Sequence, residues 1–213
     1  MALGLLLRRR EQREIAEIQD MVVYSIYRIM DPPPVLHGGT VIWRVYGSPR
    51  FSEDIDAYHE NPGTYREQLE KELNAYQIRI AKFKETANAA YIAVERERRV
   101  RLEFLKKPWK LGTAEAEFHL VDGGFIIVKT LTPEHLLQEK IQAYLERRKA
   151  RDLFDIYYLL SHVKIEELKD SLQKLATNLD QPPPDWSELR VLILKGLPPS
   201  YETVKKKILR AIT

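Results

Sequence analysis

Apolar residues recur at helical spacing near the start of the chain, over Glu11–Met30. Ile15, Ile18 and Val22 fall on one face of a helix drawn through this stretch. Three consecutive prolines follow at 32–34, and proline both lacks a backbone donor and restricts the residue before it. The pattern therefore predicts an amphipathic helix that ends at the proline run.

The middle of the chain changes to short alternating segments, which predict a sheet. We expect strands over Val35–Leu36, Phe51–Tyr58, Ala90–Val94, Val100–Leu105, Ala116–Val121 and Phe125–Leu131. Two helices are expected among them, a short one over Val41–Tyr46 and a long polar one over Thr64–Lys84. The turn Asp122-Gly123-Gly124 is typical of a β-hairpin.

From residue 132 onward the spacing is helical again. Thr132 before Pro133 is typical of a helix start, because threonine can cap the first turn and proline fits its first position. Leu153–Leu160 is apolar on almost every side, as in a buried helix. This order of elements predicts an α+β fold, with an α/β core over residues 1–131 and a helical region over residues 132–213.

The composition excludes several kinds of chemistry. Cysteine is absent, so disulfides, thiolate zinc sites and a cysteine nucleophile are ruled out. No apolar run is long enough to span a bilayer. The apolar residues within 1–10 precede the arginines, which reverses the order of a secretory signal. We therefore expect a cytoplasmic protein that does not contact membranes.

Charge alone does not identify a partner, since a formal net charge of +3 is small. Basic residues do gather in three places, Arg8–Arg10, Arg96–Arg101 and Arg147–Arg151. For each cluster taken alone, a solvated and salt-bridged surface is a better interpretation than a track for nucleic-acid phosphates.

Two carboxylates in Phe51–Tyr58 have the spacing of a metal site. On a strand, Asp54 and Asp56 share one face, about 7 Å apart at Cα, while Ile55 and Ala57 face the core. Two like charges this close repel unless a cation lies between them. Magnesium prefers carboxylate oxygens and keeps positions open for water and phosphates. The alternative is an exposed strand edge with acidic side chains.

A glycine turn lies just before this strand, at Gly38-Gly39-Thr40. Paired glycines between a strand and a helix let backbone amides approach a phosphate closely. Thr40 can cap the helix or bind a phosphate oxygen, and Arg44 follows one turn later on the same face. A simple strand-to-helix turn would explain these residues equally well if they stood alone.

The two segments together, Gly38–Arg44 and Arg50–Asp56, resemble the signature of the AbiEii/AbiGii toxin nucleotidyltransferases. That family belongs to the DNA polymerase β-like superfamily. The resemblance implies a small mixed sheet with helices, followed by a helical half that completes the active-site cleft. It also implies that Asp54 and Asp56 bind Mg²⁺ or Mn²⁺. The nucleotide-binding residues would then be Gly38, Gly39, Thr40, Arg44 and Ser52.

Two downstream segments also resemble motifs of this family. Leu131–Ala143 is similar to its third motif and contains Lys140, with isoleucine following where leucine is usual. Arg148–Asp155 is similar to its fourth motif and contains Asp152. The resemblance implies that Lys140 stabilises developing charge and that Asp152 orients Lys140 or the acceptor. Both residues are therefore expected to be catalytic, together with the metal-binding pair.

The residues themselves leave alternatives open at these positions. The stem of Lys140 could pack on the core with its ammonium in water. Asp152 could pair with Arg148, and Asp155 with Arg151, each four residues apart on a helix. The alternative for Asp155 is a structural role, in which it anchors two helices.

A third metal-binding carboxylate is another open question. Glu103 alternates with Leu102 and Phe104, so on a strand it faces away from the core. Polymerase β-like sites commonly take a third carboxylate from a later strand. An ordinary solvent-facing strand residue explains Glu103 as well.

The expected reaction is transfer of a nucleoside monophosphate from an NTP to an RNA (tRNA) or protein acceptor, with release of pyrophosphate. The resemblance implies the toxin of a toxin–antitoxin or phage-defence pair, and therefore a cognate antitoxin. One alternative is an NTP-dependent phosphotransferase that uses the same carboxylates. Another is a non-catalytic module that binds RNA or a protein partner.

Overall fold

A computed structural model describes residues 3–106 and 112–212 of the chain. The chain divides into two compact units. Unit 1 comprises Met1–Gly47 and Phe51–Thr130, and unit 2 comprises Ser48–Arg50 and Leu131–Thr213. The sheet belongs to unit 1, whereas unit 2 is helical.

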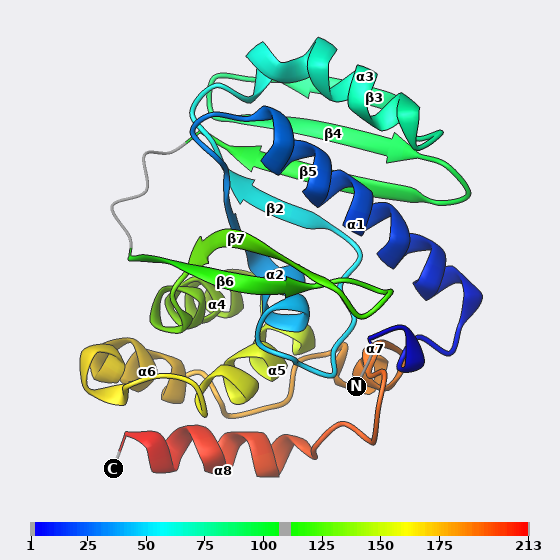
Figure 1. Cartoon of the computed structure of the whole chain (residues 1–213). Helices are drawn as coiled ribbons and strands as arrows, with labels where there is room; N and C mark the ends of the chain where they lie inside the picture. The colour runs from blue at the N-terminus through cyan, green and yellow to red at the C-terminus, as the bar shows by residue number, and fades with distance from the viewer. Residues whose placement is uncertain (1–2, 107–111, 213) are drawn as a thin grey trace. The chain divides into compact units, whose positions relative to one another are not determined.

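Unit 1 contains a mixed sheet of seven strands in the order β3-β4-β5-β2-β1-β7-β6 (Figure 1). The strands are β1 (Val35–His37), β2 (Ile55–Tyr58), β3 (Arg79–Glu85), β4 (Ala89–Glu95), β5 (Arg99–Leu105), β6 (Thr113–His119) and β7 (Phe125–Leu131). Strand β2 pairs antiparallel with β1 and parallel with β5, while β1 pairs parallel with β7. The structure confirms the expected α+β class and each expected strand, although β2 begins at Ile55 and not at Phe51.

The helices of unit 1 are α1 (Arg10–Ile29), α2 (Gly38–Arg44) and α3 (Arg66–Ala75), with 3-10 turns η1 (Leu3–Leu5) and η2 (Pro62–Tyr65). Helix α1 confirms the amphipathic helix predicted from the apolar spacing. Its buried residues pack toward α3 and β5, and Ile18 and Val22 are fully buried. Every residue of α2 is buried, and this helix contacts β1, β2 and β6.

The predicted long helix over Thr64–Lys84 is wrong in its second half. Helix α3 ends at Ala75, and Gln77 takes a left-handed backbone conformation with φ of 58°. A left-handed residue terminates a helix. The chain then forms β3, which pairs antiparallel with β4. Polar residues such as Lys82 are compatible with either state, so the pairing with β4 decides the conformation.

Arg44 corrects a second expectation, because its side chain lies in the core and not beside the glycine turn. The guanidinium is fully buried and pairs with Asp20 of α1 at 2.8 Å. It also donates to the backbone oxygens of Ala16 and His119, and lies over the Trp43 ring. Burial lowers the pKa of Arg44 to about 10, against the opposing charge of Asp20. We therefore assign Arg44 to core packing and leave it out of the nucleotide site.

Unit 2 is built from the helices α4 (Pro133–Arg147), α5 (Ala150–Leu159), α6 (Lys169–Ala176), α7 (Leu189–Leu192) and α8 (Tyr201–Ala211), with 3-10 turns η3 (Ile165–Leu168) and η4 (Trp186–Glu188). Thr132 stands at the N-cap position of α4, as expected, but its hydroxyl contacts the Nδ1 atom of His135 and not the helix backbone. Helix α4 packs on α5 and α6, and α8 packs on α5 and α6. Helix α5 is buried on most sides, as its apolar sequence predicts.

None of the helices in the described part of the chain is both long enough and apolar enough to cross a membrane.

The buried Arg44–Asp20 pair should dominate the stability of unit 1. We expect Asp20→Ala to destabilise the protein by about 3 kcal/mol, because it leaves a guanidinium buried without its counter-charge. For a protein of this size the melting temperature should fall by roughly 6–12 °C. Arg10→Gln is the control, since it removes only an exposed pair with Glu14, which contributes less than about 1 kcal/mol. Equal melting temperatures of the two variants would contradict this assignment.

Candidate active site

Three polar side chains form a row across the middle of the sheet in unit 1. In the strand registers, Asp56 of β2 lies opposite His37 of β1 and opposite Glu103 of β5. Directly opposite residues project from the same face of a sheet. Ile55 and Ala57 are buried on the other face, which confirms the alternation expected of this strand. The row therefore brings Asp56 and Glu103 together on the face away from the core.

Asp54 lies just before β2 and is held by an arginine of β5. The Arg101 guanidinium donates two hydrogen bonds to its carboxylate, Nε to Oδ1 at 3.0 Å and Nη2 to Oδ2 at 2.8 Å. These hydrogen bonds and the charge of Asp54 raise the pKa of Arg101. The Arg101 side chain is 73% exposed and that of Asp54 34% exposed. Arg101 was not among the residues expected in the site, although it shares the alternation that singles out Glu103.

The glycine turn approaches the Asp56 carboxylate closely. Gly38 has a φ of 75°, and a Cβ built on it would lie 2.2 Å from Oδ2 of Asp56. Only glycine therefore fits at this position. The His37 ring before it stacks on Tyr58, with the ring centroids 4.2 Å apart.

Thr40 and Ser52 connect the site to its surroundings through the backbone. The Thr40 hydroxyl is buried and donates to the backbone oxygen of Asp54, so it fixes α2 to the approach of β2. The backbone oxygen of Ser52 accepts a hydrogen bond from Gln19 at 2.9 Å, and the Ser52 side chain is partly exposed. In this structure Thr40 positions Asp54, whereas the Ser52 side chain keeps access to solvent.

The donor chemistry of this region fits a hard cation. Burial raises the pKa of Glu103, and the charge of the Asp56 carboxylate raises it further, which marks a local excess of negative charge. Among the residues that the structure describes, no three His, Asp or Glu side chains are grouped to hold a metal ion. Asp54 and Asp56 would supply two carboxylates to a cation bound in this region. Magnesium accepts such a set when water and substrate phosphates complete its coordination.

In unit 2, Lys140 belongs to a buried ion network. Its Nζ lies 2.9 Å from Oδ2 of Asp155 and 3.5 Å from Oδ1 of Asp152, and both carboxylates are fully buried. Arg50 donates to both oxygens of Asp155, and Arg147 donates to both oxygens of Asp152. Lys140 is thus neither solvated nor unpaired.

The charges of this network determine the ionisation of Asp155. Burial opposes its ionisation, but Arg50 and Lys140 outweigh burial and hold the pKa of Asp155 below its ordinary value. The same pairing raises the pKa of Arg50, although burial alone would lower it. Asp155 therefore anchors Lys140 of α4 to α5 as a charged group.

The alternative partners considered from the sequence, Arg148 for Asp152 and Arg151 for Asp155, are wrong. Arg148 takes a left-handed conformation with φ of 48° at the end of α4, so it does not share a helix with Asp152. Arg151 is exposed, whereas Asp155 points inward. Helical spacing could not reveal the actual partners, because Arg50 lies 105 residues before Asp155.

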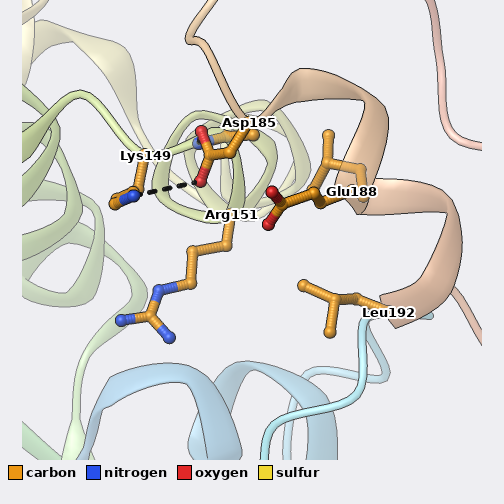
Figure 2. A pocket seen from close by; sticks show the side chains of 7 residues that line it. Lys149, Arg151, Asp185, Glu188 and Leu192 are labelled. Atoms are coloured by element: carbon orange, nitrogen blue, oxygen red, sulfur yellow. Dashed lines mark hydrogen bonds and ion pairs between the residues drawn. The ribbon is translucent and has the colours of Figure 1, made fainter.

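Unit 2 also contains a pocket of about 350 Å³ at the start of α5 (Figure 2). Its lining residues are Lys149, Ala150, Arg151, Asp185, Glu188, Leu189 and Leu192. Asp185 accepts the backbone N–H of Ala150 at 2.9 Å and pairs with Lys149 at 3.7 Å. The Asp185 carboxylate is thus already bonded to the first residues of α5. The described lining contains side chains of both charges, and these contacts do not indicate a particular ligand.

The arrangement of strands and helices matches solved nucleotidyltransferase structures. A protein from H. pylori described as a putative nucleotidyltransferase superposes with a TM-score of 0.67 at 19% identity, covering 96% of this chain and 94% of that chain. MenT4, a nucleotidyltransferase toxin from Mycobacterium tuberculosis, superposes with a TM-score of 0.69 at 15% identity, covering 98% of this chain and 87% of that chain. These similarities define the class of fold, that of the nucleotidyltransferases.

Sequence comparison identifies the family within this class. The family described as nucleotidyl transferase AbiEii toxin, type IV TA system, matches residues 27–211. The chain therefore belongs to the AbiEii family of nucleotidyltransferase toxins, which confirms the resemblance of its motifs. No curated protein sequence matches the chain.

The close contact between Gly38 and Asp56 can be tested by adding one methyl group. We expect Gly38→Ala to displace the Asp56 carboxylate and weaken metal-dependent NTP binding at least tenfold, as measured by calorimetry. Gly196→Ala is the matched control, because Gly196 has a similar φ of 83° but nothing within 4 Å of the added Cβ. Each variant should lose about 1–2 kcal/mol from backbone strain. Unchanged NTP affinity in folded Gly38→Ala would refute the role of this contact.

Proposed function

We propose that this nucleotidyltransferase is metal-dependent, with Asp54 and Asp56 as the ligands of Mg²⁺ or Mn²⁺. The observation that carries the proposal is the close approach of Gly38 to the Asp56 carboxylate, near Asp54, which Arg101 of β5 holds. Because Gly38 has no side chain, the Asp56 carboxylate lies directly against the glycine turn, so a cation on this carboxylate would bring its phosphates to that turn. Bound there, the cation would neutralise charge on the transferred phosphate and lower the pKa of an attacking hydroxyl.

The residues around this pair have distinct proposed roles. Gly38 and Gly39 are buried at the start of α2, and in this proposal their backbone amides bind phosphate oxygens, while Ser52 offers a partly exposed hydroxyl. Thr40 keeps the Asp54 backbone in place from within the core. Glu103 lies opposite Asp56 in the strand register and adds negative charge near the cation, without completing a group of three carboxylate ligands among the described residues. In this proposal the chain binds and orients the NTP, and the attacking hydroxyl comes from the acceptor.

Lys140 and Asp152 are proposed as the contribution of unit 2 to the reaction. A lysine that approaches a transferring phosphate stabilises the charge that develops there. The contacts of Lys140 with Asp152 and Asp155 support an orienting role for the two carboxylates, since they restrict where the ammonium can lie. Arg50 helps to hold the pKa of Asp155 below its ordinary value, and Arg147 is hydrogen-bonded to both oxygens of Asp152.

An RNA acceptor is proposed in preference to a protein acceptor. The row of Asp56 and Glu103 continues in register to Tyr91 of β4 and Lys84 of β3. Tyr91 is 43% exposed, and Lys82 and Lys84 are exposed on β3. An exposed aromatic ring near cations can stack a base and bind phosphates. The arginine clusters support this role less, because Arg96 and Arg98 pair with glutamates.

A toxin of this family is expected to act with an antitoxin, and we propose that this chain has a cognate antitoxin protein. The type IV toxin–antitoxin description of the family supports that partner. The activity itself is therefore best measured on the isolated chain.

The reaction type can be tested with NTPs labelled at the α- or γ-phosphate, incubated with total RNA and total protein. We expect α-label to enter RNA in the presence of Mg²⁺, and Asp56→Asn to reduce transfer about 100-fold or more. Transfer of γ-label would instead identify a phosphotransferase. Label in protein would identify a protein acceptor, and no transfer of either label would favour a non-catalytic binding module.

Lys140→Met separates a catalytic lysine from a structural one, because methionine keeps the apolar stem and removes the ammonium. We expect the transfer rate to fall about 100- to 1000-fold if Lys140 meets the transferring phosphate. Thermal stability should also fall, because Lys140 pairs with two buried aspartates.

Arg147→Met is the matched control, since it also removes one cation from the buried Asp152 carboxylate. Rate and melting temperature would be measured for both variants. A similar rate loss in both would assign Lys140 to the ion network alone.

A further inference from the structure

Arg101 holds the Asp54 carboxylate, which is one of the two proposed metal ligands. Its guanidinium uses both carboxylate oxygens of Asp54, at 3.0 and 2.8 Å. This fork uses one lone pair on each oxygen of Asp54, and its positive charge disfavours a cation at the remaining lone pairs. The pair therefore competes directly with metal at this residue.

The register of the sheet makes this contact a built-in feature of the fold. In the parallel pairing of β2 with β5, Ile55 lies opposite Leu102. Asp54 and Arg101 each come one residue earlier on their strands, so they are neighbours for the same reason that Asp56 and Glu103 are. Alternation along β5 then puts Arg101 and Glu103 on one face.

We propose that Arg101 has two positions: it holds Asp54 in the metal-free protein, and it binds the triphosphate of the nucleotide once a divalent cation has taken Asp54. This inference rests on the proposed metal site. Arg101 is a nucleotide-binding residue in the second position, and its ligand class is a polyphosphate anion.

The exposure of the pair makes the exchange feasible. Arg101 is 73% exposed, and an ion pair in contact with water is weak enough to be displaced. A guanidinium fits phosphate oxygens with the same two-pronged geometry that it uses on a carboxylate. When the cation binds Asp54, the Arg101 guanidinium is released from that carboxylate. It is then free to pair with the phosphate oxygens of the nucleotide.

The test uses Arg101→Gln, with Arg99→Gln as the matched control. Arg99 lies two residues away on the same face of β5, but it pairs with Glu95 and not with Asp54. Affinity for Mn²⁺ alone is measured by electron paramagnetic resonance. Affinity for inorganic triphosphate is measured by calorimetry at saturating Mn²⁺. Neither readout depends on catalytic activity.

We expect Arg101→Gln to bind Mn²⁺ about fivefold more tightly than Arg99→Gln, because a competing cation has gone. It should bind triphosphate about tenfold more weakly than Arg99→Gln, because a charge-assisted hydrogen bond has gone. A general loss of positive charge would raise the Mn²⁺ affinity and lower the triphosphate affinity of Arg99→Gln as well. The difference between the two variants therefore isolates the specific role of Arg101.

Three results would overturn the inference. Equal Mn²⁺ affinity of the two variants would show that Arg101 does not compete with metal for Asp54. Equal triphosphate affinity would show that Arg101 does not bind the triphosphate. If the wild-type protein binds no Mn²⁺, or binds it equally after Asp54→Asn, the proposed metal site itself fails. Failure of the role proposed for Arg101 can therefore be distinguished from failure of the proposed metal site.

Discussion

Strand β2 is held in register by strands on both sides, β1 and β5, and the candidate site depends on that register. A slip of one residue along either neighbour would turn Asp56 from the open face of the sheet to the buried one. The paired registers place His37, Asp56 and Glu103 in one row. They also bring Arg101 to Asp54. The buried alternation of Ile55 and Ala57 fixes the register because both side chains lie in the core.

The two units manage their charges in opposite ways. In unit 2, two fully buried aspartates are surrounded by the cations of Arg50, Lys140 and Arg147, so every buried carboxylate there is matched. In unit 1, Asp54 has an exposed arginine partner, and the pKa of Glu103 is raised by burial and by the nearby Asp56 carboxylate. A network that is already neutralised gains little from another cation. A cluster with excess negative charge gains much, and this contrast favours unit 1 as the place where a metal enters.

Local patterns in the sequence predicted the parts of the fold that depend on local chemistry. The apolar spacing of α1, the alternation of Ile55 and Ala57, and the proline at the start of α4 each act within a few residues. The errors concern contacts between distant segments. Arg44 pairs with Asp20 across 24 residues and Arg101 with Asp54 across 47. Strand β3 forms where its own residues tolerate a helix, because β4 offers a partner. Residue spacing along one helix or strand cannot predict such contacts. The sequence could therefore suggest Asp54 and Asp56 as candidate site residues but could not predict the positions of Arg44 and Arg101.

Two arginines of unit 1 show why burial decides which charges can take part in chemistry. Arg44 is fully buried, and its partner Asp20 cannot be exchanged without leaving a charge unpaired in the core, which costs about 3–5 kcal/mol. Arg101 makes a similar ion pair with Asp54 at the surface, where water replaces a lost partner and the cost is about 1 kcal/mol or less. The same residue type is thus locked in one position and exchangeable in the other. The proposed site would admit a cation and a nucleotide and later release a product, and such a site requires the exchangeable kind.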